Sequence, residues 1–137
     1  MKSTAGTPWS RISASLAPGD HATTFGGGPF VATVALDVVR TIAEPEFLAA
    51  VRAKGEWLGA RLGALATRSA RVKEARGRGL MWGLELTEAA APFVAAARER
   101  HLLVLTAGPN VIRIVPPLTI TREELERGAT ILEEVLA

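Results

Sequence analysis

Residues 80–86 alternate between apolar and other side chains, and this alternation constrains the fold more than any other feature of the chain. A period of two predicts a β-strand with one face packed on a core and the other face toward solvent. Such a strand needs neighbouring strands and a layer that covers its apolar face. The two expected faces consist of Leu80, Trp82, Leu84 and Leu86 on one side and Met81, Gly83 and Glu85 on the other.

Helical periodicity supplies the covering layer. We expect helices over about 46–67, over 88–100 with Pro92 in the first turn, and from Thr121 onward, where Glu124 completes a capping box. Short strands are expected over 102–106 and over 111–115, before Pro116-Pro117. This order predicts an α+β fold, with helices on one face of a small, largely antiparallel sheet. The expected buried stripes are Phe47, Leu48, Val51, Leu58, Leu62 and Leu65 in the first helix and Leu125, Ala129, Leu132 and Leu136 in the last.

A further helix is predicted from Pro29 to about Ala43, with Gly28 as its cap. Its polar residues form one narrow stripe, so the helix is apolar over most of its circumference and must be buried on several sides. We therefore expect a partner subunit or a missing domain to cover it. The chain is divided into an irregular lead-in (1–17), a loop with the interface helix (18–45) and a C-terminal domain (46–137).

Composition limits the classes of partner. Of 137 residues, 48% are hydrophobic and 22% charged, and the net charge of +2 is too even to imply nucleic acid or an anionic membrane as the main partner. Residues 68–78 carry five basic side chains against one acidic one, which favours a solvated sheet edge over a phosphate or RNA site because no aromatic residues are interleaved. The absence of cysteine fits a reducing cytoplasm, and neither a secretory signal nor a membrane-spanning run is expected.

The stretch from His21 to Pro29 combines two hydroxyls, Thr23 and Thr24, with three glycines ahead of the predicted helix. Glycines allow close backbone approach, and the free N–H groups at a helix start suit a phosphate. The same pattern also makes an ordinary N-terminal turn. This stretch is therefore a candidate anion site.

Arg113 is the second candidate, because alternation places Val111 and Val115 on its face of the strand. Its planar guanidinium suits a carboxylate bound through two hydrogen bonds. The alternative is an edge strand with Arg113 directed to solvent or to a nearby glutamate. His21 and His101 lie eighty positions apart, so no metal site is expected. Trp57 and Trp82 are interpreted as core or interface residues.

Three segments together resemble a known family. Residues 18–29 resemble P-G-D-H-x-[ST]-T-[FY]-G-G-N-P, and residues 72–81 resemble V-x-x-x-R-G-x-G-L-M, of the class III (ornithine-type) aminotransferases. Residues 102–118 are similar to the C-terminal signature of the same enzymes. The order and spacing of the three motifs agree with the family from about Leu16 to Ala137. Their residues are most similar to those of the acetylornithine branch.

The resemblance implies the C-terminal part of a pyridoxal-phosphate enzyme of fold type I, a homodimer with active sites between subunits. The expected reaction is amino transfer from N-acetylornithine to 2-oxoglutarate in arginine biosynthesis. By the same resemblance, Thr24 binds the cofactor phosphate of the partner subunit, Thr23 lies at the substrate, and Arg113 holds the substrate α-carboxylate.

Two departures from the family pattern matter. Gly28 replaces an asparagine cap, and the Schiff-base lysine of the family lies upstream of the matching region. Lys2, Lys54 and Lys73 do not match it, so we expect no catalytic residue and no transaminase activity in this chain alone. The competing hypothesis is a stand-alone, non-catalytic α+β binding or interaction domain derived from the aminotransferase fold.

Overall fold

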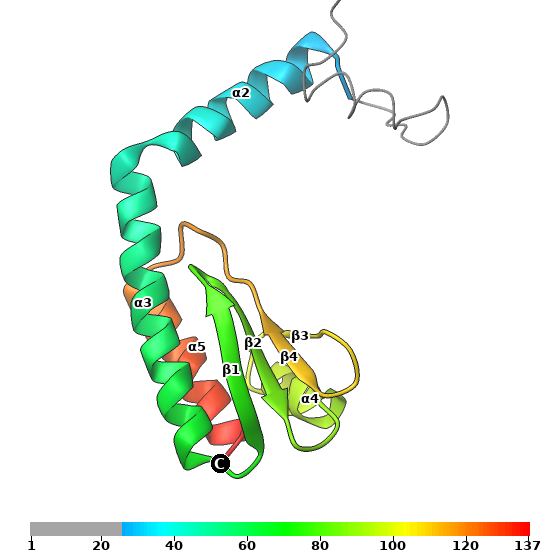
Figure 1. Ribbon diagram of the computed structural model, residues 1–137. Coiled ribbons are helices and arrows are strands. Elements are labelled where there is room, and N and C mark those ends of the chain that lie inside the picture. Colours follow the sequence, from blue (N-terminus) through cyan, green and yellow to red (C-terminus); the bar gives the residue numbers. More distant parts are fainter. Residues whose placement is uncertain (1–25) are drawn as a thin grey trace, which may run out of the picture. The chain divides into compact units, whose positions relative to one another are not determined.

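The computed structural model describes residues 26–137 (Figure 1). Their contacts divide them into two units, the first ending at Ile42 and the second running from Ala43 to Ala137. Each unit is described by itself below.

The first unit holds a turn and nearly all of helix α2 (Pro29–Ala43), which begins at the predicted proline. Gly27 has a φ of +81°, which glycine adopts without steric cost. The carbonyl of Gly28 accepts the N–H of Ala32 at 2.9 Å, so the helix is capped from a glycine as expected. No residue of α2 is buried, and Phe30 is 80% exposed.

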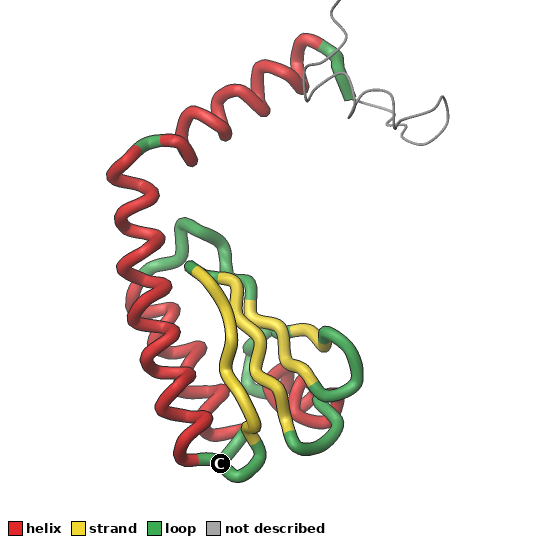
Figure 2. The backbone as a smooth tube through the Cα atoms, in the orientation of Figure 1, coloured by secondary structure: helices red, strands yellow, loops and turns green. Residues whose placement is uncertain are grey.

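The second unit has the predicted α+β architecture, with the elements in the predicted order (Figures 1 and 2). Its four strands form one antiparallel sheet in the order β1-β2-β4-β3. The elements are α3 (Pro45–Arg68), β1 (Val72–Arg78), β2 (Met81–Leu86), α4 (Ala91–Glu99), β3 (Leu105–Thr106), β4 (Val111–Ile114) and α5 (Arg122–Val135).

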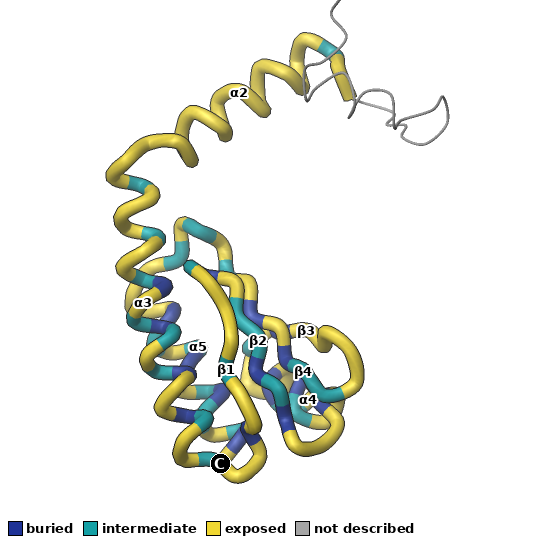
Figure 3. The backbone as a smooth tube through the Cα atoms, viewed as in Figure 1, coloured by how far each residue is buried: buried dark blue, intermediate teal, exposed yellow. Residues whose placement is uncertain are grey.

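One hydrophobic core joins the three helices of this unit to a single face of the sheet (Figure 3). Leu84 and Ile112, adjacent on β2 and β4, are fully buried, which confirms the alternation predicted for β2. The stripe predicted for the last helix is confirmed in full. The helices contribute Leu58, Leu62 and Leu65 of α3, Val94 and Ala97 of α4, and Leu125, Ala129 and Leu132 of α5.

Helix α3 approaches the β1–β2 hairpin closely at two glycines. A Cβ atom added to Gly55 would lie 2.5 Å from the carbonyl oxygen of Gly79, and one added to Gly59 would lie 2.4 Å from the Trp82 ring. Gly79 itself opens the hairpin loop with a φ of +57°, as a two-residue loop with glycine first requires. Helix α3 therefore packs closely on the hairpin at these two positions, because glycine has no side chain to hold them apart.

Helix α5 begins with a capping box and is joined to α3 near its other end. The capping box predicted at its start is present: the Thr121 hydroxyl accepts the N–H of Glu124 at 3.2 Å, and the Glu124 carboxylate accepts the N–H of Thr121 at 2.9 Å. Beyond its other end, the Ser69 hydroxyl donates to the carbonyl of Leu136 at 2.6 Å. Between them, Arg61 Nε donates to Glu133 at 2.9 Å.

Two predicted elements were too long. The strand expected over 102–106 is reduced to β3, because the Leu102 N–H closes the end of α4 on the carbonyl of Ala97 at 2.9 Å. The helix expected over 88–100 begins only at Ala91, immediately before Pro92. His101 follows this helix with a φ of +63°, in the position that usually holds glycine.

Candidate functional site

The outer face of the sheet carries a row of residues that come from all four strands. Arg76 on β1 lies opposite Gly83 on β2, and Gly83 lies opposite Arg113 on β4. Leu105 on β3 completes the row, opposite Arg113. The next row, with Leu84 and Ile112, faces the core, so this row faces outward.

Arg113 is exposed at the centre of this face. The alternative is wrong about an edge strand, because β4 lies between β2 and β3, but its expectation that Arg113 is directed to solvent is confirmed. Within residues 26–137 the Arg113 side chain has no hydrogen bond or ion pair, so its five N–H donors face solvent. An arginine on an inner strand with no acceptor nearby is available to a ligand carboxylate.

A shallow hollow surrounds Arg113. It exists because Gly83 has no side chain: a Cβ there would lie 3.3 Å from Cγ1 of Val111 and would stand between Arg76 and Arg113. The residues that line the hollow are Arg76, Gly77, Arg78, Met81, Trp82, Gly83, Ala107, Val111 and Arg113.

An ion-pair network lies beside the hollow. The Glu85 carboxylate accepts Lys73 Nζ at 2.8 Å and Arg76 Nη1 at 2.6 Å, and Arg76 also contacts Glu74 at 3.0 Å. The hydrogen bond from Lys73, together with that from Arg76, holds the pKa of Glu85 below its ordinary value. Both cations have their pKa raised by the same partner.

The predicted sheet edge within 68–78 is confirmed, since β1 is an outermost strand. Several basic side chains of this run form ion pairs with glutamates that lie outside it. A count of charges within residues 68–78 could not predict these pairs. Arg71 contacts Glu88 at 2.7 Å, and Arg68 contacts Glu133 at 3.3 Å. Most of this basic run is therefore neutralised locally.

Both lysines of the described range are already engaged. Lys54 Nζ donates to the carbonyls of Leu118 and Ile120, at 2.8 and 2.9 Å. These bonds fasten the loop that follows β4 to helix α3. Lys73 is held by Glu85.

The candidate phosphate residues cannot be placed in this geometry. His21, Thr23 and Thr24 lie outside the described residues. Arg76, Gly83 and Glu85 were not predicted as neighbours of the site. Only the strand register, with Gly83 opposite both arginines, reveals them.

The two candidate aromatic residues have structural contacts. Trp82 Nε1 donates to the carbonyl of Gly79 at 2.8 Å, and its ring packs on α3. Trp57 lies under the guanidinium of Arg122, 3.9 Å from the ring centre. Both are partly buried against the core, as predicted.

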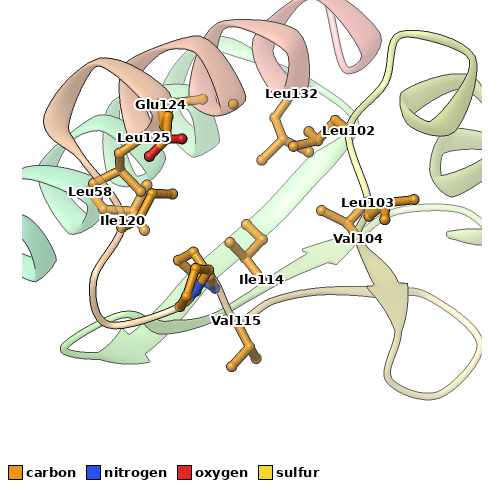
Figure 4. Close-up of a pocket in the computed structure, with 14 residues that line it drawn as sticks. Leu58, Leu102, Leu103, Val104, Ile114, Val115, Ile120, Glu124, Leu125 and Leu132 are labelled. Carbon is orange, nitrogen blue, oxygen red and sulfur yellow. The ribbon is translucent and has the colours of Figure 1, made fainter.

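A separate apolar pocket of about 250 Å³ lies between α3, α5 and the segments around Val104 and Pro116 (Figure 4). Leu125 and Leu132 of α5 face Ile114 across it. Its one titratable group is Glu124, whose pKa is held below the ordinary value by hydrogen bonds from the backbone and hydroxyl of Thr121. This carboxylate is occupied by the helix cap, so the pocket offers no free reactive group.

Across residues 26–137 no group of side chains is arranged to hold a metal ion. No helix in that range is long and apolar enough to cross a membrane.

Comparison with known proteins decides the family. The model of the family "Aminotransferase class-III" matches residues 3–136. The chain belongs to the class III aminotransferases. It is 47% identical over 127 residues to the mitochondrial acetylornithine aminotransferase of Alnus glutinosa, covering 92% of this chain and 28% of the relative. The acetylornithine aminotransferase of Gloeobacter violaceus is also 47% identical, over 122 residues that make up 88% of this chain and 30% of the relative.

Two solved structures share the fold over most of this chain. Acetylornithine aminotransferase from Elizabethkingia anophelis matches 91% of this chain and 34% of its own, at 26% identity and a TM-score of 0.76. A phospholyase from Arthrobacter, solved with phosphoethanolamine, matches 93% of this chain and 32% of its own, at 28% identity and the same TM-score of 0.76. The chain therefore spans about a third of the length of the proteins it resembles.

Proposed function

We propose that this chain is the C-terminal, carboxylate-binding part of an aminotransferase that moves an amino group from N-acetylornithine to 2-oxoglutarate. The observation that carries the proposal is the unpartnered guanidinium of Arg113, exposed in a glycine-floored hollow. The relatives at 47% identity support the acetylornithine donor and a place in arginine biosynthesis.

Arg113 would bind the substrate α-carboxylate through two parallel N–H···O bonds. Because β4 is held by strands on both sides, the backbone of Arg113 is fixed before binding, and only side-chain freedom is lost when the carboxylate binds. The hollow at Gly83 gives the rest of the substrate room beside this bond. By the family resemblance, Thr23 would lie at the substrate.

The family depends on pyridoxal phosphate, and the described residues fit only the carboxylate end of such a site. When bound, the cofactor would supply an electron sink for the substrate carbon that carries the transferred amino group. By the same resemblance, Thr24 would donate its hydroxyl to the cofactor phosphate of the partner subunit. Lys54 and Lys73 do not line the hollow around Arg113, so neither is placed to attach the cofactor there.

We propose further that the active enzyme is a cytoplasmic homodimer and that the attaching lysine belongs to another part of the polypeptide. The apolar surface of α2 supports an extensive protein partner, since a helix of this composition is stable in water only when covered. By itself the 137-residue chain would then have no transaminase activity.

The test is a titration of the ¹⁵N-labelled chain with glutarate, a dicarboxylate that resembles 2-oxoglutarate, followed through the arginine Nε–H signals. We expect the Arg113 signal to shift in the unsubstituted chain and in Arg122→Gln, whose guanidinium lies on Trp57. In Arg113→Gln, the signals of Arg76 and Arg78, which line the same hollow, should no longer respond to glutarate. Equal shifts at all arginines, or none at Arg113, would contradict the carboxylate site.

A non-catalytic binding domain is the competing function, favoured by the engagement of both described lysines. Borohydride reduction of the chain with pyridoxal phosphate tests whether any lysine of this chain attaches the cofactor. We expect no stoichiometric label on any lysine. A single fully labelled lysine would show that the chain holds its own attachment point.

A further inference from the structure

Glu85 has the same register relationship to two arginines. It lies two residues beyond Gly83 on β2, and Gly83 is opposite Arg76 on one side and opposite Arg113 on the other. Glu85 is thus the diagonal neighbour of both. Diagonal neighbours in an antiparallel sheet are about 7–8 Å apart at the backbone, within reach of arginine and glutamate side chains.

The pairing is nevertheless one-sided. Glu85 takes Lys73 on one carboxylate oxygen and Arg76 on the other, and its side chain is only 19% exposed. Arg113 forms no ion pair with Glu85 within the described range. Lys73 reaches Glu85 from the irregular pairing between Val72 and Glu74, where the β1–β2 register shifts. Two cations on the outermost strand therefore hold the carboxylate that lies nearest in register to Arg113.

We propose that Lys73 and Arg76 are positioning residues, which keep Glu85 away from Arg113 and so leave that arginine free for the substrate carboxylate. The inference rests on the proposed function of Arg113. Without these two cations, Glu85 would be a tethered carboxylate beside Arg113, at a high effective concentration, and would compete with the substrate.

The structure supports each step of this competition. Glu85 does not line the hollow, whereas both arginines that flank Gly83 do. Glu74 is held as well, through Arg76. Glu74 and Glu85 are thus both paired with cations of β1. The Arg113 guanidinium on β4 remains unpaired within the described range.

The experiment compares glutarate affinity in the chain and in Lys73→Met/Arg76→Met. We expect binding at Arg113 to weaken roughly twofold to fivefold, the range of a competing exposed ion pair. Adding Glu85→Gln to this double variant should restore the affinity. The matched control Arg68→Met/Arg71→Met removes two cations that do not contact Glu85 and should leave affinity within about twofold.

Loss of affinity that Glu85→Gln does not restore would overturn the proposal, because it would show a general effect of positive charge. An equal loss of glutarate affinity in Arg68→Met/Arg71→Met would also overturn the proposal, for the same reason. If the double variant fails to fold, Arg76→Met alone should give a smaller loss of the same sign, again restored by Glu85→Gln.

A second readout needs no ligand. In the unsubstituted chain, Glu85→Gln should leave the Arg113 Nε–H signal unchanged, whereas in the Lys73→Met/Arg76→Met background it should shift that signal. A shift already present in the unsubstituted chain, or none in either background, would overturn the inference. If glutarate binds no variant, the carboxylate function fails, while this readout still decides whether Glu85 is diverted from Arg113.

Discussion

Two glycines of helix α3 should respond in opposite directions to the same substitution. At Gly63 an added methyl group meets open space, with nothing within 4 Å. At Gly55, which is buried, the added carbon would lie 2.5, 2.6 and 2.7 Å from the carbonyl oxygen, carbonyl carbon and Cα of Gly79. The two residues occupy the same helix, so the intrinsic gain from replacing glycine by alanine is the same at both.

That gain is about 0.5–1 kcal/mol, from the lower conformational entropy of alanine in the unfolded chain. Gly63→Ala should show it in full and raise the melting temperature by about 2–8 °C. At Gly55 the contact is with backbone atoms, so the helix or the hairpin must move. Overpacking of this kind costs about 1–3 kcal/mol, so the net change is a loss of up to about 2.5 kcal/mol.

The assay is urea unfolding of the full chain, followed by circular dichroism of the helices. Gly63→Ala should raise the midpoint and Gly55→Ala should lower it, with the slope unchanged in both. Equal stabilisation at the two positions would refute the close approach of α3 to the hairpin at Gly79. Gly59→Ala, which meets the movable Trp82 ring rather than backbone, should fall between them.

Three further substitutions test other features of the second unit. His101→Gly should stabilise it by about 1 kcal/mol in urea unfolding, because His101 has a φ of +63° that glycine adopts freely; no change would show that this backbone is not strained. Thr121→Ala should cost about 0.5–2 kcal/mol through loss of the α5 cap, whereas Thr130→Ala, on the exposed surface of the same helix, should cost less. The hydrogen bond from Arg61 holds the pKa of Glu133 below its ordinary value of 4.5, so its contribution is present above that pH and is lost on acidification through the lowered pKa. Glu133→Gln should therefore flatten the acid loss of stability, and an unchanged pH profile would contradict the pairing.

Local patterns predicted much of this protein. The alternation around Leu84, the stripe through Leu125 and Leu132, and the Thr121 capping box depend on residues a few positions apart, so they could be identified before any tertiary contact was known. The extent of β3 could not be predicted in this way, since Leu102 bonds to the end of α4 instead of to the sheet.

In the candidate site, too, one residue could be predicted from the sequence, whereas its neighbours could not. Arg113 is visible in the sequence because a guanidinium interrupts a run of branched apolar residues, and the family motifs agree with it. Its surroundings are set by strand register: only the pairing of β1, β2 and β4 brings Arg76 and Gly83 into line with Arg113, and only the irregular pairing near Val72 gives Lys73 to Glu85. A register is fixed by the burial of whole strand faces against the helices, which is a property of the assembled core and not of any short segment.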